Sequence, residues 1–365
     1  MSRYDRWQNR IEAIQQAGRF RQVFSVDPLS ATEAVFRGQQ VIVACSNDYL
    51  GIAYRAPAVG RRGAGSSRLI GGSRPLHHAL EAELEDWYGR PALVFGSGYQ
   101  ANLAVFSTIC GSGETIASDE SNHASMIDGM RLSRANRVIV PHCAPDQIPK
   151  GATAVAVEGL FSMDGDIPPL TRYPAGPWLA VDEAHAVGAL GPDGRGASAN
   201  QGITPDIIVG TFGKALGAFG AFVIGPPELK TLLANEARSF IFTTALPENT
   251  IANCIDGIRT VRTQPELQST LHENTRMFRS FLNQLGWSPL GDAHIVPVVV
   301  GPSVMKLSER LLTRGILAPG IRWPTVAVGS ERIRFTVSAA HTAEQLQRIA
   351  DALGTRTSWE QENAD

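Results

Sequence analysis

The sequence has few cysteines and no local pairing among them. Only four occur in 365 residues, and no two are spaced as a CxxC pair. Scattered thiols of this kind argue against a disulfide framework and against a zinc site built on cysteine pairs. They favour small buried side chains in a reducing compartment. The four are Cys45, Cys110, Cys143 and Cys254.

The sequence also lacks a long run of one charge. It has 33 Lys and Arg against 35 Asp and Glu, for a formal net charge of −2. Surfaces that bind nucleic acid or anionic membranes usually carry clustered positive charge, so neither partner is expected. Residues 1–16 are charged and amphipathic, unlike a secretory signal. The apolar run after Lys214 falls well short of the roughly 20 residues of a membrane span. These features predict a cytoplasmic protein.

Hydrophobic periodicity predicts two domains. Between about residues 41 and 249, short apolar runs alternate with helical patterns, which is typical of a large, mainly parallel α/β sheet domain. Over residues 250–358, helical patterns surround two strands and predict a smaller α+β domain. The N-terminal segment 1–40 contains an amphipathic helix over about 5–20, and the polar tail 359–365 is expected to fray.

The ends of the predicted strands carry most of the chemically useful side chains. In open α/β sheets, ligands bind beyond the carboxyl ends of the strands. These ends and the turns after them hold Asp182 and His185, Glu158 and Ser162, Thr211 and Lys214, and His123. A single aspartate or histidine in such a place is more often a turn or packing residue, so the argument rests on the combination.

A glycine turn precedes one of the predicted helices. In "FGSGYQAN", Gly98 and Tyr99 stand where free backbone N–H groups and the helix dipole can bind a phosphate. Glycine and serine mark many strand-to-helix turns, so the motif is weak by itself. Lys214, the only charged residue of "TFGKALGAFGAFVIG", could by itself be an ordinary phosphate-binding lysine.

Two other kinds of site fit the sequence less well. The motif "VDEAH" resembles the acidic box of helicase-type ATPases, but the only Gly-Lys pair, Gly213-Lys214, is followed by Ala215 and completes no GxxxxGK[ST] loop. A zinc site from Asp182, Glu183 and His185 lacks further ligands at suitable spacing, so no metal is expected.

The remaining combination is what pyridoxal 5′-phosphate (PLP) requires. A lysine bonds covalently to the cofactor, a carboxylate keeps the pyridine nitrogen protonated, an imidazole packs on the ring, and a helix N-terminus holds the phosphate. Lys214 would then be an amine engaged with a cofactor, and its neighbouring glycines would allow backbone and ring to approach closely.

Seven motifs in one order extend this hypothesis. They are "SNDYLG", "GSSRLIGGSRPLHHALEAEL", "FGSGYQAN", "EGLFSMDGD", "VDEAHAVGALGPDGRG", "TFGKALG" and "RIRFTVSAAH". Together, over about residues 5–355, they resemble the α-oxoamine synthases, a branch of the fold type I PLP enzymes. The resemblance implies an aspartate aminotransferase-like fold, a homodimer, and an acyltransferase reaction that joins an amino acid to an acyl thioester.

The resemblance also implies a role for individual residues. Lys214 is the cofactor-bonding lysine and Asp182 the partner of the pyridine nitrogen, while His123 stacks on the ring. The other implied cofactor contacts are His185 and Ser162 near the ring hydroxyl, Gly98, Tyr99 and Thr211 at the phosphate, Thr244 at the phosphate from the partner subunit, and Glu158 behind the site. Arg334 holds the amino-acid carboxylate, and Arg21, Asn47 and Thr325 line the acyl-substrate side.

Within this family, "SNDYLG" favours the member that condenses L-alanine with a pimeloyl thioester in biotin biosynthesis. Other members remain open, such as 2-amino-3-ketobutyrate CoA ligase, 5-aminolevulinate synthase and α-aminoketone synthases. The segment 52–64 is shorter than the family's, and Trp323 stands where proline is frequent. Both departures lie near the acyl entrance, so acyl length and carrier, CoA or acyl carrier protein, stay open.

No spare segment is large enough for the DNA-binding module of a PLP-fold regulator, and the complete set of cofactor residues argues against an inactive paralogue.

Overall fold

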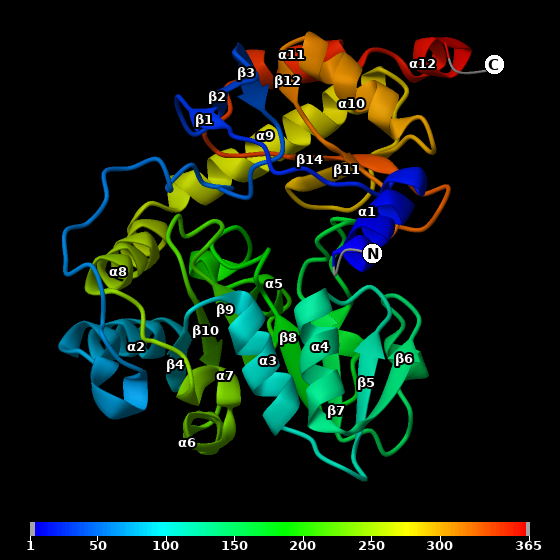
Figure 1. Ribbon diagram of the computed structural model, residues 1–365. Coiled ribbons are helices and arrows are strands. Elements are labelled where there is room, and N and C mark those ends of the chain that lie inside the picture. The colour runs from blue at the N-terminus through cyan, green and yellow to red at the C-terminus, as the bar shows by residue number, and fades with distance from the viewer. Residues whose placement is uncertain (1–3, 363–365) are drawn as a thin grey trace.

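A seven-stranded sheet forms the centre of the larger domain in the computed structural model, which describes residues 4–362 (Figure 1). The strand order is β4-β10-β9-β8-β7-β5-β6, and β10 alone runs antiparallel to its neighbours. The predicted mainly parallel α/β fold is therefore confirmed. The strands are β4 (Ala92–Phe95), β5 (Thr115–Asp119), β6 (Asn136–Val140), β7 (Ala154–Glu158), β8 (Trp178–Asp182), β9 (Ile207–Thr211) and β10 (Ala221–Ile224).

Both faces of this sheet are covered, which is why its central strands read as unbroken apolar runs. Ala154 and Ala156 pack in the cluster under helices α3 and α4, whereas Val157 packs in the cluster on the opposite side. The helices of this domain are α2 (Pro75–Tyr88), α3 (Gly98–Thr108), α4 (Ala124–Ser133), α5 (Ala197–Asn200), α6 (Pro227–Glu236) and α7 (Arg238–Ile241). Helix α2 ends before Gly89, which takes the left-handed conformation at φ 69°.

A smaller α+β body adjoins the sheet domain (Figure 1). Its three-stranded antiparallel sheet has the order β11-β14-β13, and a second sheet has the order β1-β2-β3-β12. The strands are β1 (Asp27–Pro28), β2 (Glu33–Phe36), β3 (Gln39–Val43), β11 (Ile295–Val299), β12 (Ile316–Leu317), β13 (Gly320–Ile321) and β14 (Arg332–Thr336). The helices that follow the sheet domain are α8 (Glu248–Thr263), α9 (Pro265–Gln284), α10 (Val304–Thr313), α11 (Ala343–Leu353) and α12 (Arg356–Glu362).

The chain around residue 41 and the tail from residue 359 pack in ways that the sequence-based prediction did not include. Strand β3 pairs in parallel with β12, so the chain around the predicted boundary at residue 41 lies beside C-terminal strands. The tail predicted to fray from residue 359 is helical to Glu362, because Trp359 is buried and the Arg310 guanidinium lies 4.7 Å from its ring centroid. Residues 363–365 of that tail, and residues 1–3 of the N-terminal segment, lie outside the described residues.

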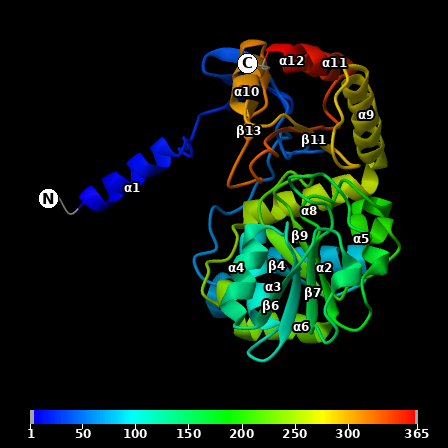
Figure 2. The ribbon, with the colours of Figure 1, turned by 90° about the vertical axis from the view of Figure 1, so that its right-hand side faces the viewer.

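Helix α1 (Asp5–Gln16) forms within the predicted range 5–20 and has no buried residue. It projects away from the rest of the chain (Figure 2). Within residues 4–362, no helix combines the length and apolar character needed to span a bilayer.

Candidate active site

Three neighbouring strands deliver polar side chains to one edge of the large sheet. Glu158 ends β7, Asp182 ends β8 and Thr211 ends β9, and Glu158 and Asp182 are register partners. Lys214 follows β9 by three residues, and His123 is the N-cap of α4. The parallel register thus gathers the predicted residues at the carboxyl edge, where α/β sheets bind ligands.

The Asp182 carboxylate is held in a fixed orientation. Its Oδ2 accepts a hydrogen bond from Asn102 Nδ2 at 2.6 Å, and its Oδ1 accepts one from the Ala184 backbone N–H at 2.9 Å. The side chain is only 6% exposed. A buried carboxylate held this way is suited to pairing with a cationic nitrogen, because hydrogen bonds to its oxygens fix the direction of its charge.

The Lys214 side chain is half-buried, and among residues 4–362 its amine makes no hydrogen bond, although its backbone carbonyl accepts one from the Gly217 N–H at 2.9 Å. Burial lowers the pKa of its amine to about 8, against the attraction of Asp182 and Glu158. A substantial neutral fraction is therefore present near pH 8. The turn after the lysine needs glycine: Gly217 has φ 62°, and a Cβ there would lie 2.6 Å from the Ala53 backbone nitrogen.

Glu158 lies behind these groups and is almost fully buried. Burial, and secondarily the Asp182 charge, raises its pKa to about 8. Its Oε2 accepts from the Ser162 backbone N–H at 3.2 Å, whereas the buried Oε1 has no partner among the described residues. Near neutral pH the carboxyl group is largely protonated, so it adds a hydrogen-bond donor to the site rather than a second negative charge.

The His185 ring is buried and neutral. Burial lowers its pKa well below the usual value, and the Lys214 and Arg334 charges add to the effect. Its Nδ1 lies 2.6 Å from the Tyr49 hydroxyl. Burial raises the pKa of Tyr49 to about 12, so the hydroxyl keeps its proton. The same hydroxyl also donates to Asn47 Oδ1 at 3.1 Å, so Tyr49 connects His185 to Asn47.

A cradle of backbone N–H groups forms at the start of α3. Ser97 Oγ accepts from the Gln100 N–H, and the first intrahelical bond runs from the Ala101 N–H to the Ser97 carbonyl. The N–H groups of Gly98 and Tyr99 precede both bonds, and a Cβ built on Gly98 would meet no atom within 4 Å. Space and backbone donors therefore suit an anion at this helix N-terminus.

Two of the predicted phosphate and ring contacts are already engaged within the chain. Thr211 Oγ1 donates to the Gly220 carbonyl at 3.0 Å and accepts from the Gly213 N–H at 3.1 Å. The Tyr99 hydroxyl donates to Asp128, and the Tyr99 ring lies edge-on to the His123 ring at 6.4 Å between centroids. Tyr99 therefore supports the His123 ring as well as supplying a backbone N–H.

Arg334 and Asn47 meet where the small body contacts the sheet domain. Arg334 Nε donates to the Ser162 carbonyl, and its Nη1 donates to Asn47 Oδ1 at 3.3 Å. Arg332, two residues earlier on β14, bonds instead to Asp164 Oδ1 at 2.5 Å. The two arginines thus have different partners, and Arg334 is the one beside Asn47.

The predicted acyl-side residues Arg21 and Thr325 also meet. Arg21 Nη2 donates to Thr325 Oγ1 at 3.2 Å. Arg322 reinforces this contact by donating from Nε to the Gly18 carbonyl at 3.2 Å. Thr244 lies elsewhere: it is exposed and forms an isolated antiparallel bridge with Ser67.

Three residues of the site were missed by the sequence-based prediction, although two lie in quoted motifs and the third lies close to His123. They are Tyr49 in "SNDYLG", Asn102 in "FGSGYQAN" and Ser125 two residues after His123. Asn102 could have been found, because a polar residue one turn after Gly98 shares the buried stripe of α3 with apolar neighbours.

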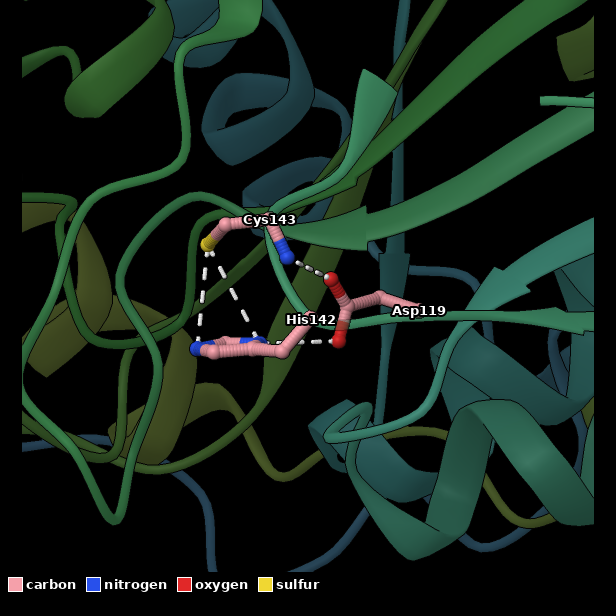
Figure 3. Close-up of side chains that lie close together, drawn as sticks. All are labelled: Asp119, His142 and Cys143. Carbon is pink, nitrogen blue, oxygen red and sulfur yellow. Dashed lines mark hydrogen bonds and ion pairs between the residues drawn. The ribbon is translucent and has the colours of Figure 1, made fainter. Parts of the chain in front are cut away.

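A separate group of possible metal ligands consists of Asp119, His142 and Cys143 (Figure 3). Both ring nitrogens of His142 are already paired, Nδ1 with Asp119 at 3.0 Å and Nε2 with Asp166 at 2.7 Å. These hydrogen bonds raise the pKa of His142 to about 12. An imidazolium has no free lone pair for a metal, so the group is explained as a partly buried ion-pair network.

Comparisons with known proteins agree with the geometry. Residues 39–353 match the family model for aminotransferase class I and II. An 8-amino-7-oxononanoate synthase of Methylococcus capsulatus is 42% identical over 353 residues, covering 88% of this chain and 90% of the relative.

Solved structures show the same fold. A serine palmitoyltransferase from S. paucimobilis with a bound PLP–myriocin aldimine superposes with a TM-score of 0.88 at 28% identity, covering 99% of this chain and 98% of the other. An 8-amino-7-oxononanoate synthase from Francisella tularensis superposes with a TM-score of 0.76 at 25% identity, covering 88% and 99%.

Proposed function

The chain belongs to the class I and II aminotransferase family, and from that premise we propose that it condenses L-alanine with a pimeloyl thioester to form 8-amino-7-oxononanoate, with loss of carbon dioxide. One observation carries the proposal. Lys214 lies within electrostatic reach of Asp182, and Asn102 of α3 bonds to Asp182, while Arg334 with Asn47 adjoins this group through Ser162 and Glu158.

The residues present fit PLP as the cofactor. Asp182 would hold the pyridine nitrogen, the N–H groups of Gly98 and Tyr99 the phosphate, and Lys214 the covalent link, with His123 on the ring. The cofactor, when bound, withdraws electrons from the α-carbon of the amino acid. The Oε1 of Glu158 has no hydrogen-bond partner within residues 4–362, which supports a site that a polar ligand completes.

The chain's own side chains supply binding and proton transfer. Arg334 would hold the alanine carboxylate, since a guanidinium matches a carboxylate with two parallel hydrogen bonds. Lys214, with a pKa of about 8, can take the proton from the α-carbon and return it to the product. The neutral His185 ring would contact the ring-hydroxyl region together with Ser162.

We assign the acyl side to the contact between Arg21 and Thr325. The arginine can pair with phosphate of the acyl carrier, whether CoA or the phosphopantetheine arm of an acyl carrier protein. A homodimer completes the site in this proposal, with Thr244 at the partner's phosphate. It is supported by large apolar side chains exposed beside the Ser67–Thr244 bridge, namely Leu69, Ile70 and Phe242.

The test is product mass. The purified protein is offered L-alanine, glycine or L-serine, each with pimeloyl-, propionyl-, acetyl- and palmitoyl-thioesters on CoA, and pimeloyl also on acyl carrier protein. We expect 8-amino-7-oxononanoate from alanine and pimeloyl thioester. Each acyl methylene buried from water contributes about 0.8 kcal/mol, so four extra methylenes should favour pimeloyl over a propionyl-length chain by roughly a hundredfold in kcat/KM.

Other outcomes of the same panel identify other members. Preference for glycine with acetyl-CoA would assign 2-amino-3-ketobutyrate CoA ligase activity and reject the proposal. Preference for serine with palmitoyl-CoA would assign the reaction named for the structural neighbour from S. paucimobilis.

A further inference from the structure

A chain of hydrogen bonds connects two of the site's functional groups. Asn102 Nδ2 donates to Asp182 Oδ2 at 2.6 Å and to Ser125 Oγ at 2.9 Å. Ser125 Oγ lies 2.7 Å from His123 Nδ1. Asn102 and Ser125 are buried, with exposures of 2% and 1%. The chain crosses from α3 to the strand end of β8 and to the first turn of α4.

The direction of every bond in this chain is fixed. The Ser125 backbone N–H also points at His123 Nδ1, at 3.3 Å, and a backbone N–H can only donate. Nδ1 is therefore an acceptor, so the Ser125 hydroxyl donates to it. The same hydroxyl oxygen accepts from Asn102. The Asn102 amide cannot be reversed, because its carbonyl oxygen would then face the Asp182 carboxylate.

We propose that Asn102 is a positioning residue that orients Asp182 and, through Ser125, holds His123 with its single proton on Nε2. The part of this inference that concerns the contact between His123 Nε2 and the substrate rests on the proposed function. The His123 side chain is exposed toward solvent, and its Nε2 bonds to no other described residue. His123 therefore presents an N–H donor to a carboxylate or carbonyl oxygen of the substrate, and it cannot act as a base at that atom.

Two variants test the chain, each with a matched control. Ser125→Ala removes the hydroxyl donor, whereas Ser133→Ala removes another buried hydroxyl of α4 that donates only to the Met130 backbone carbonyl. Asn102→Ala removes the double donor, whereas Asn274→Ala removes a buried amide that donates only to backbone carbonyls, including those of Ser338 and His341.

The measurement is the ¹⁵N NMR spectrum of the cofactor-loaded protein labelled at its eight histidines, with the His123 signals identified by their loss in His123→Asn. We expect an unprotonated Nδ1 and a protonated Nε2 in the native protein. In Ser125→Ala the ratio of the two tautomers should fall about fivefold, the value of one neutral hydrogen bond, while the longer backbone contact persists. Ser133→Ala should leave the ratio unchanged.

Kinetics supply the second readout. Asn102→Ala should lower kcat about tenfold or more with a smaller change in alanine KM, because it frees a carboxylate that acts on the bound cofactor. A protonated Nδ1 in the native protein overturns the proposal, as does an Asn102→Ala enzyme that matches Asn274→Ala. If Asn102→Ala fails to fold, the tautomer ratio in Ser125→Ala decides. The tautomer is measured without turnover, so a failure of the proposed reaction would be seen separately.

Discussion

The Lys214 amine can lose its proton near neutral pH, since burial lowers its pKa to about 8. Only the neutral amine can bond to a cofactor aldehyde. We therefore expect the rate of PLP uptake by the apoprotein to rise about tenfold per pH unit below 8 and to level off above it. The measurement is visible absorbance after mixing, from pH 6 to 9.5.

Two variants distinguish the contribution of Lys214 to this pH dependence from that of its neighbour Glu158, whose pKa is also about 8. Glu158→Gln should keep the rise and move its midpoint only slightly, because the Glu158 carboxyl group is largely protonated below pH 8 and gives the ammonium little charge stabilisation there. Lys214→Ala should abolish covalent fixation of PLP by borohydride. A cofactor still fixed in Lys214→Ala would show that another amine forms the link.

Asp182→Asn replaces a carboxylate by a neutral amide of the same shape. The cofactor phosphate keeps its cradle, so we expect PLP to remain bound. The cationic pyridine nitrogen loses its partner, and removal of one member of a buried charge pair costs about 3–5 kcal/mol, which is roughly a thousandfold in rate. Cofactor content and kcat/KM check this, and turnover near that of the native enzyme would remove Asp182 from this role.

Strand β14 carries two nearly buried arginines that have different partners and, in this proposal, different roles. Arg334 lies beside Asn47, whereas Arg332 is paired with Asp164. Arg334→Lys keeps the charge but loses the planar pair of donors, so alanine KM should rise at least tenfold with a smaller change in kcat. Arg332→Lys is the matched control and should alter thermal stability more than KM. Equal effects on KM from the two variants would contradict the assignment of Arg334.

The elements of the sheet domain could be predicted because their signals are local. The buried runs before Glu158, Asp182 and Thr211 end at polar residues, and parallel pairing brings such ends to one edge. Alternation along "RIRF" also placed Arg332 and Arg334 on one face, but the choice between them needed the family resemblance. The structure adds the reason, since only Arg332 meets Asp164.

Contacts between distant segments could not be read from the sequence. Tyr49 reaches His185 across 136 residues, and β3 pairs with β12 across more than 270. Neither contact leaves a periodic pattern, because each depends on how the two bodies pack. The helical end of the chain was missed for a similar reason: Trp359 is buried by the Arg310 side chain of another helix. Composition alone described that segment as polar.

The molecule as a whole is expected to work as a dimer with shared sites. Thr244 is exposed, and two large apolar side chains beside the Ser67–Thr244 bridge, Ile70 and Phe242, are 84% and 71% exposed. Exposed apolar side chains that gather in this way are suited to self-association about a two-fold axis. Light scattering should therefore give twice the chain mass of 39.2 kDa.

A mixed dimer tests whether Thr244 acts across the interface. Thr244→Ala should weaken PLP binding roughly tenfold, as expected for a hydrogen bond to a charged group, and Lys214→Ala should be inactive. If the two variants are co-refolded in equal amounts, half of the dimers are mixed, and each mixed dimer contains one site with its own Lys214 and an intact Thr244 from its partner. At limiting PLP, activity should then recover to about one quarter of the native value, because half of the dimers have one of two sites restored. If Thr244 instead acts within its own chain, no site is restored and the mixture stays as defective as its parts.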